Sequence, residues 1–182
     1  MKTHQNTNGK KMHAEELIIH LGLKPLPWEG GWYRETWRTE STIPSDVLGD
    51  AYSGGRSAGT AIYYLLTPET VSRMHRLPSD ETFHFYMGDA VEMLLLYPPE
   101  TGATRSRIVT FGQDIANCQH VQFTVPGNVW MGARLKAGGT YGYALMGTTV
   151  SPGFDFDDLE MAEDGVLAKA YPDRKGLIAA LS

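Results

Sequence analysis

Polar and ionisable residues cluster in the middle of the chain, between two apolar segments, 60–66 (TAIYYLL) and 91–97 (VEMLLLY). The cluster consists of Ser72, Arg73, His75, Arg76, Asp80, Glu81 and His84. The apolar segments have the composition of buried strands, so ionisable groups between them would be desolvated. Desolvated groups have shifted pKa values, which suit general acid–base catalysis. The pattern makes His75 and Glu81 the candidate catalytic residues, with Arg73 as a candidate donor to the ligand.

Strand parity decides which of these residues can share a pocket. If residues 81–87 form one regular strand, Glu81 shares a face with Phe83 and Phe85, whereas His84 lies on the opposite face. His84 is then a poor partner for Glu81 in a metal site. We therefore interpret it as a structural or interface residue.

A second candidate binding segment is GGWYRETWR (residues 30–38). Alternation places Tyr33 and Glu35 on one face, where the ring could stack on a ligand and the carboxylate could accept hydrogen bonds. Arg34 would face the other way. The alternative is an edge strand whose aromatic residues only pack.

Two further aromatic residues are ligand-binding candidates. Trp130 follows a Pro-Gly-Asn turn and could form the wall of a pocket or belong to the ordinary core. Tyr63 lies in the apolar segment 60–66.

The elements that must position these residues are mostly strands. Ala14, Leu17, Ile18 and Leu21 recur at helical spacing, and Gly22 and the following prolines end that helix. From Trp28 onward, short β-type segments alternate with Gly-, Pro- and Asp-rich turns every 8–12 residues or so, which is typical of an antiparallel sandwich or barrel. Leu177, Ile178 and Leu181 indicate a short closing helix.

Composition bounds the remaining possibilities. The chain has 182 residues, which corresponds to one domain, and we expect a disordered leader at 1–12 and a single domain at 13–182. Sixteen Lys and Arg against 21 Asp and Glu give a net charge of −5, which argues against duplex nucleic acid as a partner. One cysteine excludes a disulfide scaffold, and no segment is typical of a secretory signal or membrane span. We expect a cytoplasmic location.

An acidic segment follows the last expected long strand. Residues 137–168 contain no Lys or Arg but six acids. We expect either a solvated edge or an interface that attracts cations. Asp155 could cap a short helix there.

Several ordered motifs resemble a known family. Six residues separate Glu81 from Gly88, as in the first cupin motif, and His75 falls on the first His of that motif. The segments GGWYRETWR, TAIYYLLT, SRMHRLPSDETFHFYMG, VPGNVWMG and TTVSPGFDFDDLEM, in this order, resemble the DUF985 group, also called Cupin_5. The resemblance spans roughly residues 14–175. It implies an all-β, RmlC-like cupin jelly-roll β-barrel with short helices at both ends.

The metal ligands of the usual cupin, three His and one Glu, are incomplete in this sequence. Leu77 stands at the second His and Met131 at the third, so only His75 and Glu81 remain. We therefore expect no tightly held cofactor, with a weak divalent metal site as the alternative. His75 and Glu81 are better interpreted as an acid–base pair in which the carboxylate orients the ring.

The resemblance also suggests a range of functions. Gly31-x-Tyr33-x-Glu35 is similar to a nucleotide-contacting segment of the sugar-nucleotide 3,5-epimerases, which are also RmlC-type jelly rolls. That resemblance also implies an acid tyrosine, for which Tyr63, Tyr64, Tyr141 and Tyr143 are all candidates. The chain is expected to bind a sugar, nucleotide or nucleotide-sugar, with His75 as the base of an epimerase or isomerase. Alternatives are a non-catalytic metabolite-binding module and a weakly metal-dependent enzyme. RmlC-like jelly rolls commonly form dimers, so we expect a homodimer.

Overall fold

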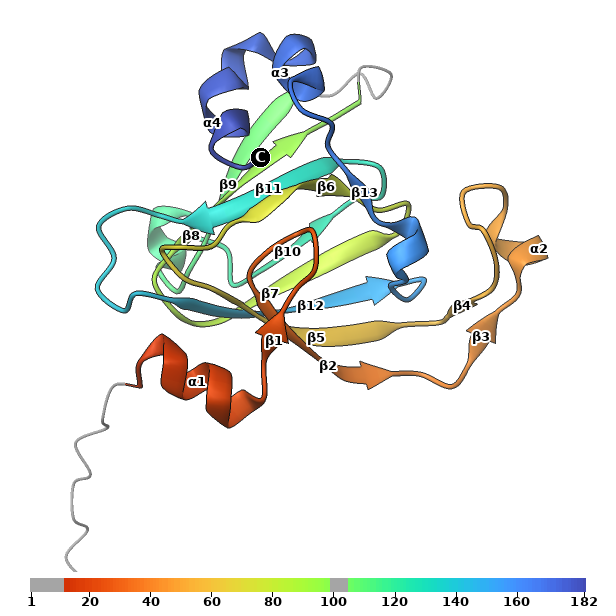
Figure 1. The fold of residues 1–182 in the computed structure, drawn as a ribbon, viewed down its shortest axis with the longest axis horizontal. Helices are drawn as coiled ribbons and strands as arrows, with labels where there is room; N and C mark the ends of the chain where they lie inside the picture. Colours follow the sequence, from red (N-terminus) through yellow and green to blue (C-terminus); the bar gives the residue numbers. More distant parts are fainter. Residues whose placement is uncertain (1–11, 99–104) are drawn as a thin grey trace, which may run out of the picture.

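The computed structural model describes residues 12–98 and 105–182 of the chain. Two antiparallel sheets face each other, and short helices lie at the ends of the molecule (Figure 1). This arrangement matches the all-β cupin fold expected from the sequence. The expected leader at 1–12 lies outside the described residues except for Met12, which packs against apolar residues near the first helix.

The larger sheet has six strands in the order β1-β2-β5-β12-β7-β10. Their bounds are β1 Lys24–Pro25, β2 Trp32–Arg38, β5 Thr60–Leu66, β12 Ala144–Ser151, β7 Asp80–Gly88 and β10 Gln122–Val125. β12 lies at the centre of the sheet and pairs with β5 on one side and β7 on the other.

The second sheet has five strands in the order β13-β6-β11-β8-β9. Their bounds are β13 Glu160–Met161, β6 Ser72–Arg76, β11 Trp130–Leu135, β8 Val91–Leu96 and β9 Ser106–Phe111. A two-stranded ribbon, β3 Thr42–Ile43 and β4 Arg56–Ser57, projects from the body beside the short helix α2, Ser45–Leu48 (Figure 1).

The main core fills the space between the two sheets. Phe83 and Phe85 of β7 are buried there against residues of β8 and β11, such as Met93 and Met131. His84 lies between them in sequence and faces the other side, where its ring nitrogens contact Thr149 and Gln122 at 3.2 Å. The expected alternation along β7 is therefore confirmed.

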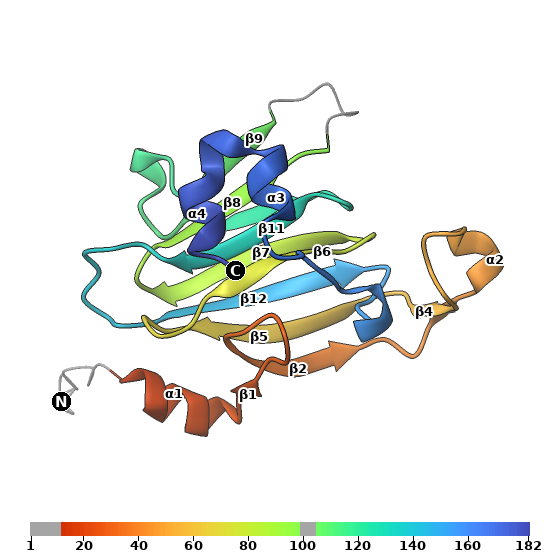
Figure 2. The same ribbon diagram turned by 45° about the horizontal axis from the view of Figure 1, so that its top comes forward.

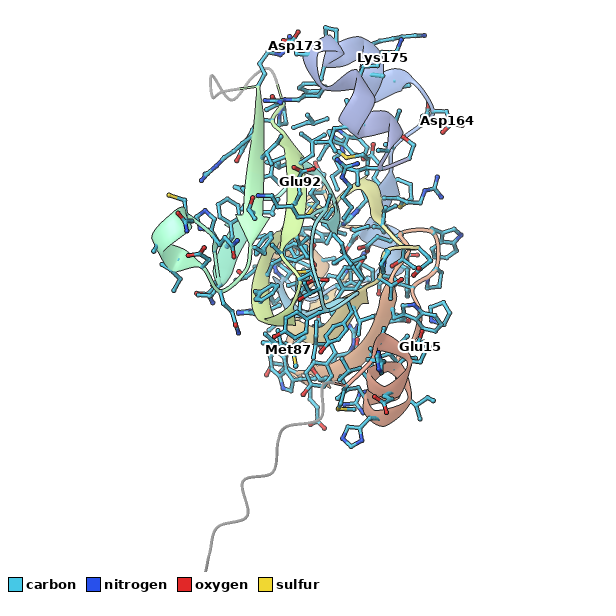
Figure 3. All side chains as sticks on the ribbon, turned by 90° about the vertical axis from the view of Figure 1, so that its left-hand side faces the viewer. Glu15, Met87, Glu92, Asp164, Asp173 and Lys175 are labelled. Carbon is cyan, nitrogen blue, oxygen red and sulfur yellow. The ribbon has the colours of Figure 1, made fainter. Side chains whose placement is uncertain are left out.

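Helices cover the outer faces of both sheets. The helix α1, Ala14–Leu21, packs through Leu17 onto Leu65 and Leu145 of the six-stranded sheet. The helices α3 (Val166–Ala170) and α4 (Lys175–Ala179) pack onto β6 and β8 of the other sheet, on the opposite side of the molecule (Figure 2). Figure 3 shows the same separation, with Glu15 at one end and Asp164, Asp173 and Lys175 at the other. Both terminal helices expected from the sequence are present, and the described part of the chain has no helix long and apolar enough to cross a membrane.

Within the residues that the structure describes, three short 3₁₀ helices occur in the connections. They are η2 (Ile115–Asn117), η3 (Phe156–Asp158) and η4 (Pro172–Arg174). Asp155 caps η3, as expected, because its carboxylate accepts a hydrogen bond from the Asp157 backbone amide at 3.0 Å.

One strand begins later than its sequence suggests. The segment TYGYALMGTTV predicts a strand from Thr140, but β12 starts at Ala144. The buried carboxylate of Asp89 accepts hydrogen bonds from the backbone amides of Thr140, Tyr141 and Gly142 at 2.7–3.0 Å. These bonds hold the amides in a turn, so they are not available to a strand partner.

Part of the acidic segment at residues 137–168 is buried in the fold, so the segment is not simply a solvated edge. Asp158 forms a buried bidentate pair with Arg56, with distances of 2.6 and 2.7 Å. Glu160 forms a more exposed pair with Arg76 at 2.8 and 2.9 Å. Part of the acidic charge thus ties the C-terminal segment to β4 and β6.

Candidate functional site

A cavity of about 430 Å³ opens on one side of the core. Its buried wall is formed by Leu26, Glu29, Thr60, Tyr64, His75, Leu77, Glu81, Thr148 and Val150. More exposed residues surround the opening, namely Lys24, Tyr33, Arg34, Glu35, Arg38, Phe154, Asp155 and Phe156, and Ile62 also contributes. The size is within the range of small-ligand pockets, and buried ionisable groups in such a pocket mark a candidate site.

His75 lies on β6 and is 2% exposed. Its Nδ1 lies 2.7 Å from the carbonyl oxygen of Arg73. A carbonyl can only accept a hydrogen bond, so Nδ1 carries the proton and Nε2 of the neutral ring keeps its lone pair. His75 can therefore act as a base through Nε2.

A register irregularity in β6 brings two polar side chains to this wall. The pairing with β11 shifts between Met131, opposite His75, and Ala133, opposite Ser72. Ser72 and His75 consequently both reach Glu29, although three positions separate them. Regular alternation would put such residues on opposite faces.

Glu81 lies near the start of β7 between Val125 and Val150 on the neighbouring strands. Burial raises the pKa of its carboxyl from 4.5 to about 7, and the charge of Glu29 adds to the rise. His75 and a hydrogen bond with Thr148 act in the opposite direction. Glu81 therefore has a substantial protonated population near neutral pH and can act as an acid.

Glu29 was not among the candidates from the sequence. It is 8% exposed, its Oε1 accepts a hydrogen bond from Ser72 Oγ at 2.9 Å, and its Oε2 lies 3.9 Å from His75 Nε2. In the described residues it is the carboxylate within ion-pair distance of His75. The expectation that Glu81 orients the ring is thus replaced: the Arg73 carbonyl holds Nδ1, and Glu29 faces Nε2.

Tyr64 is the candidate acid tyrosine that lines the cavity. Its hydroxyl donates to the carbonyl oxygen of Gly30 at 3.0 Å, and burial raises its pKa well above 10. Tyr141 and Tyr143 are not cavity-lining residues. A side chain with this pKa keeps its proton. It therefore serves as a hydrogen-bond donor and not as a general acid that gives up and regains a proton in each turnover.

Tyr33 and Glu35 both border the cavity, and Arg34, which alternation along β2 places on the other face, borders it as well. Lys24 Nζ lies 5.2 Å from the centre of the Tyr33 ring. The Glu35 carboxylate forms a bidentate pair with Arg38 at 2.7 and 3.1 Å. The opening therefore presents an aromatic face beside the ion pair of Glu35 and Arg38.

Three expected ligand-binding residues lie elsewhere. The Arg73 side chain is exposed and donates to the Trp28 carbonyl at 3.3 Å. Tyr63 faces the opposite side of its sheet, where its ring lies 6.2 Å from that of Tyr86. Trp130 packs among the residues under α3 and α4, because its neighbour Met131 takes the core-facing position on β11.

The residues at the usual cupin metal positions do not fit that metal site. Leu77 and Met131 are buried and apolar, so His75 and Glu81 supply one imidazole and one carboxylate. Across residues 12–98 and 105–182, no three His, Cys, Asp or Glu side chains are grouped so that they could hold an ion. We therefore derive no chemistry through a metal.

The chain matches solved structures over nearly its whole length. A hypothetical protein from Leishmania major is 34% identical, with a TM-score of 0.81 over 94% of this chain and 99% of that one. Protein SO0799 from Shewanella oneidensis is 30% identical, with a TM-score of 0.80 over 94% and 98%. A dTDP sugar isomerase from Desulfovibrio desulfuricans G20 shares the fold, at 18% identity and a TM-score of 0.50 over 80% and 83%.

Sequence comparison gives the same family. An uncharacterized protein of Saccharomyces cerevisiae is 31% identical over 137 residues, which are 71% of this chain and 66% of the yeast protein. The family model described as the cupin superfamily (DUF985), Cupin_5, matches residues 15–162. With the two-sheet fold and the motif spacing of His75, Glu81 and Gly88, this match shows that the chain belongs to the Cupin_5 family of the cupin superfamily.

Proposed function

We propose that this cupin binds a sugar or sugar-containing metabolite in the cavity and transfers a proton between carbon and oxygen atoms of that ligand. The observation that carries the proposal is the orientation of His75. Its Nδ1–H is held by a backbone carbonyl at 2.7 Å, so the free lone pair on Nε2 belongs to a buried base in a cavity of ligand size.

The chemistry follows from one base and one acid in the same cavity. His75 Nε2 takes a proton from the carbon next to a carbonyl group, and the electron pair of that C–H bond forms a carbon–carbon double bond. The carbonyl π electrons move to oxygen, which takes the proton that Glu81 holds near neutral pH. Return of the proton from His75 to the neighbouring carbon, while Glu81 recovers a proton from the other enediol oxygen, gives an isomer.

The lining favours a polyhydroxylated ligand. Glu29, Glu81 and Thr148 offer acceptors and donors for hydroxyl groups at the buried end, while Leu77 and Val150 offer apolar surface. A volume of about 430 Å³ accommodates a sugar, and a larger substituent would extend past Tyr33, Phe154 and Phe156. The distant likeness to a dTDP sugar isomerase serves only to place nucleotide-sugars among the compounds to test.

Hydrogen exchange into the ligand tests the proposal directly. The protein is incubated in D2O with free sugars, sugar phosphates, nucleotides and nucleotide-sugars, with and without EDTA. Proton NMR then follows loss of the signal next to each carbonyl, and thermal shifts on the same panel report binding. A ligand at 100 times its Kd stabilises the folded state by about 2.7 kcal/mol, which is readily detected.

The variants separate the possible outcomes. We expect one compound to exchange a single proton regardless of EDTA, His75→Asn to abolish exchange while the thermal shift remains, and His84→Asn to exchange normally. His84 is the matched control because it faces away from the cavity core, toward Thr149 and Gln122. Binding without exchange across the panel would identify a binding module and overturn the catalytic proposal. Loss of exchange with EDTA would overturn the metal-free chemistry.

A further inference from the structure

The loop between β1 and β2 delivers a carboxylate into the cavity with little freedom of movement. Gly30 and Gly31 have φ values of +95° and +73°, which favour glycine. A Cβ on Gly30 would lie 2.5 Å from the Val71 carbonyl oxygen, so the loop lies directly against the segment that leads into β6. The backbone amide of Arg73 donates to the Glu29 carbonyl at 2.8 Å, and this bond fixes the residue that enters the cavity.

The two oxygens of Glu29 have different surroundings. Ser72 Oγ donates to Oε1 at 2.9 Å, whereas Oε2 lies 3.9 Å from His75 Nε2. The second distance exceeds the 2.7–3.2 Å or so of an N–H···O hydrogen bond. Neutral His75 carries no proton on Nε2, so neither atom can donate to the other. When Nε2 gains a proton, this pair of atoms becomes a charge-assisted donor and acceptor.

The other ionisable groups at this point do not serve that purpose. Glu81 holds a proton near neutral pH and supplies the acid, and the Tyr64 hydroxyl donates to the Gly30 carbonyl. Glu29 is therefore the group placed to balance positive charge on the His75 ring. Its location beside a buried imidazole makes this balance strong, because charges interact more strongly away from water.

We propose that Glu29 is the carboxylate partner of His75, and that it pairs with the imidazolium formed when Nε2 takes the proton from the ligand carbon. This inference rests on the proposed function. The proton taken from carbon then lies on Nε2 in an ion pair with Glu29, where it exchanges with solvent before a proton or deuteron returns to carbon. The proton given up by Glu81 lies on the ligand oxygen until Glu81 takes it back. Glu29 acts through His75 and is therefore a positioning residue that also forms part of the cavity wall.

A purely structural role is the competing explanation, and Glu29→Gln distinguishes the two. Glutamine keeps the shape and can still accept from Ser72, but it removes the charge. Without ligand, ¹³C NMR titration of the glutamate carboxyls should show that the pKa of Glu81 falls below about 7, because the charge of Glu29 raises it in the native protein. In the same ligand-free samples, ¹⁵N-detected NMR should show that the Nε2 signal of His75 changes in Glu29→Gln, because the carboxylate 3.9 Å away is removed.

The exchange assay gives the kinetic readout. With the compound that the native protein exchanges, Glu29→Gln should lower kcat roughly a hundredfold or more while KM changes little, which is the scale of acid–base contributions. Glu29→Asp, which keeps the charge, should recover part of the rate. Glu92→Gln is the control, since Glu92 pairs with Arg134 away from the cavity.

The two proposals can fail separately. If the native protein exchanges a ligand proton and Glu29→Gln does so at the same rate, the role of Glu29 is wrong and the proposed function stands. If no compound exchanges, the proposed function fails, and an unchanged pKa of Glu81 with an unchanged His75 signal in Glu29→Gln would also overturn the pairing. If Glu29→Gln does not fold, the exchange rate and the His75 Nε2 signal of Glu29→Asp decide the point.

Discussion

Replacement of Glu81 by Gln should make the protein more stable in alkaline solution than the native chain, although it removes an ionisable group from the cavity wall. The pKa of Glu81 is raised from 4.5 to about 7 by burial and by Glu29. Between pH 4.5 and about 7, the folded state therefore holds a proton that the unfolded state has already released. The free energy of unfolding therefore falls as the pH rises through this range. Glutamine does not titrate, so Glu81→Gln removes this dependence on pH.

The size of the effect follows from the same two values. Above pH 7 the difference in proton affinity costs the native fold about 3 kcal/mol, since a tenfold change in affinity corresponds to about 1.4 kcal/mol. Below pH 4.5 both states are protonated and the cost vanishes. For a chain of this size, about 3 kcal/mol corresponds to roughly 6–12 °C in Tm.

The measurement is the free energy of unfolding of both proteins from pH 4.5 to 8.5, by urea denaturation. Any constant cost of Glu81→Gln, such as a weakened contact with Thr148, cancels when the difference is followed against pH. Glu160→Gln, which removes a carboxylate from an exposed pair with Arg76, corrects for the loss of one negative charge. A difference between native and Glu81→Gln proteins that stays flat from pH 4.5 to 8.5 would refute the reasoning and remove Glu81 as an acid at neutral pH.

Three further predictions concern the fold around the site. Arg56→Ala should destabilise the protein by about 3–5 kcal/mol in urea unfolding, because it leaves Asp158 buried without its partner. Arg76→Ala, which breaks the more exposed pair with Glu160, should destabilise it by about 1 kcal/mol. Equal losses of stability would contradict the difference in burial between the two pairs. Gly88→Ala should lower the free energy of unfolding by more than about 2 kcal/mol, since φ is +108° and a Cβ would lie 2.2 Å from the Tyr143 carbonyl oxygen. Gly142 has a φ of +74° with open space around a Cβ, so Gly142→Ala should lower it less. The reverse order would contradict the close approach at Gly88. Sedimentation at micromolar concentration tests the expected homodimer, and a monomer would overturn it.

The elements that the sequence predicted correctly are those whose signal is local. The helix at 14–21 has its apolar period, acids in its first turn and Gly22 in the left-handed conformation at its end. The alternation from Glu81 to Phe85 fixed which side chains enter the core, and it correctly turned His84 outward. Such features depend on neighbouring residues alone, so periodicity and turn chemistry are sufficient to identify them.

The parts that the sequence did not predict depend on contacts between distant segments. Glu29 reaches His75 only because the Gly30–Gly31 turn lies against β6 and because a register shift brings Ser72 to the same side. The available signal was a lone acid before two glycines, which is common in turns. Trp130 was misplaced for a related reason: a motif gives the strand, but the sheet decides which neighbour, Trp130 or Met131, faces the core.

The composition of the cavity argues for proton chemistry in place of the usual metal chemistry of the fold. Leu77 and Met131 replace two imidazoles by apolar side chains, and these changes alone would leave an inert pocket. Glu29, Glu81 and His75 are nonetheless all buried beside one another, an arrangement whose desolvation cost a purely structural core has no reason to retain. Ser72 and the Arg73 carbonyl hold two of these groups in defined orientations, and Thr148 contacts the third. Under the proposed function, the protein itself, and not an ion, stabilises the charge that develops on a ligand oxygen, and these oriented acid and base groups are placed to do so.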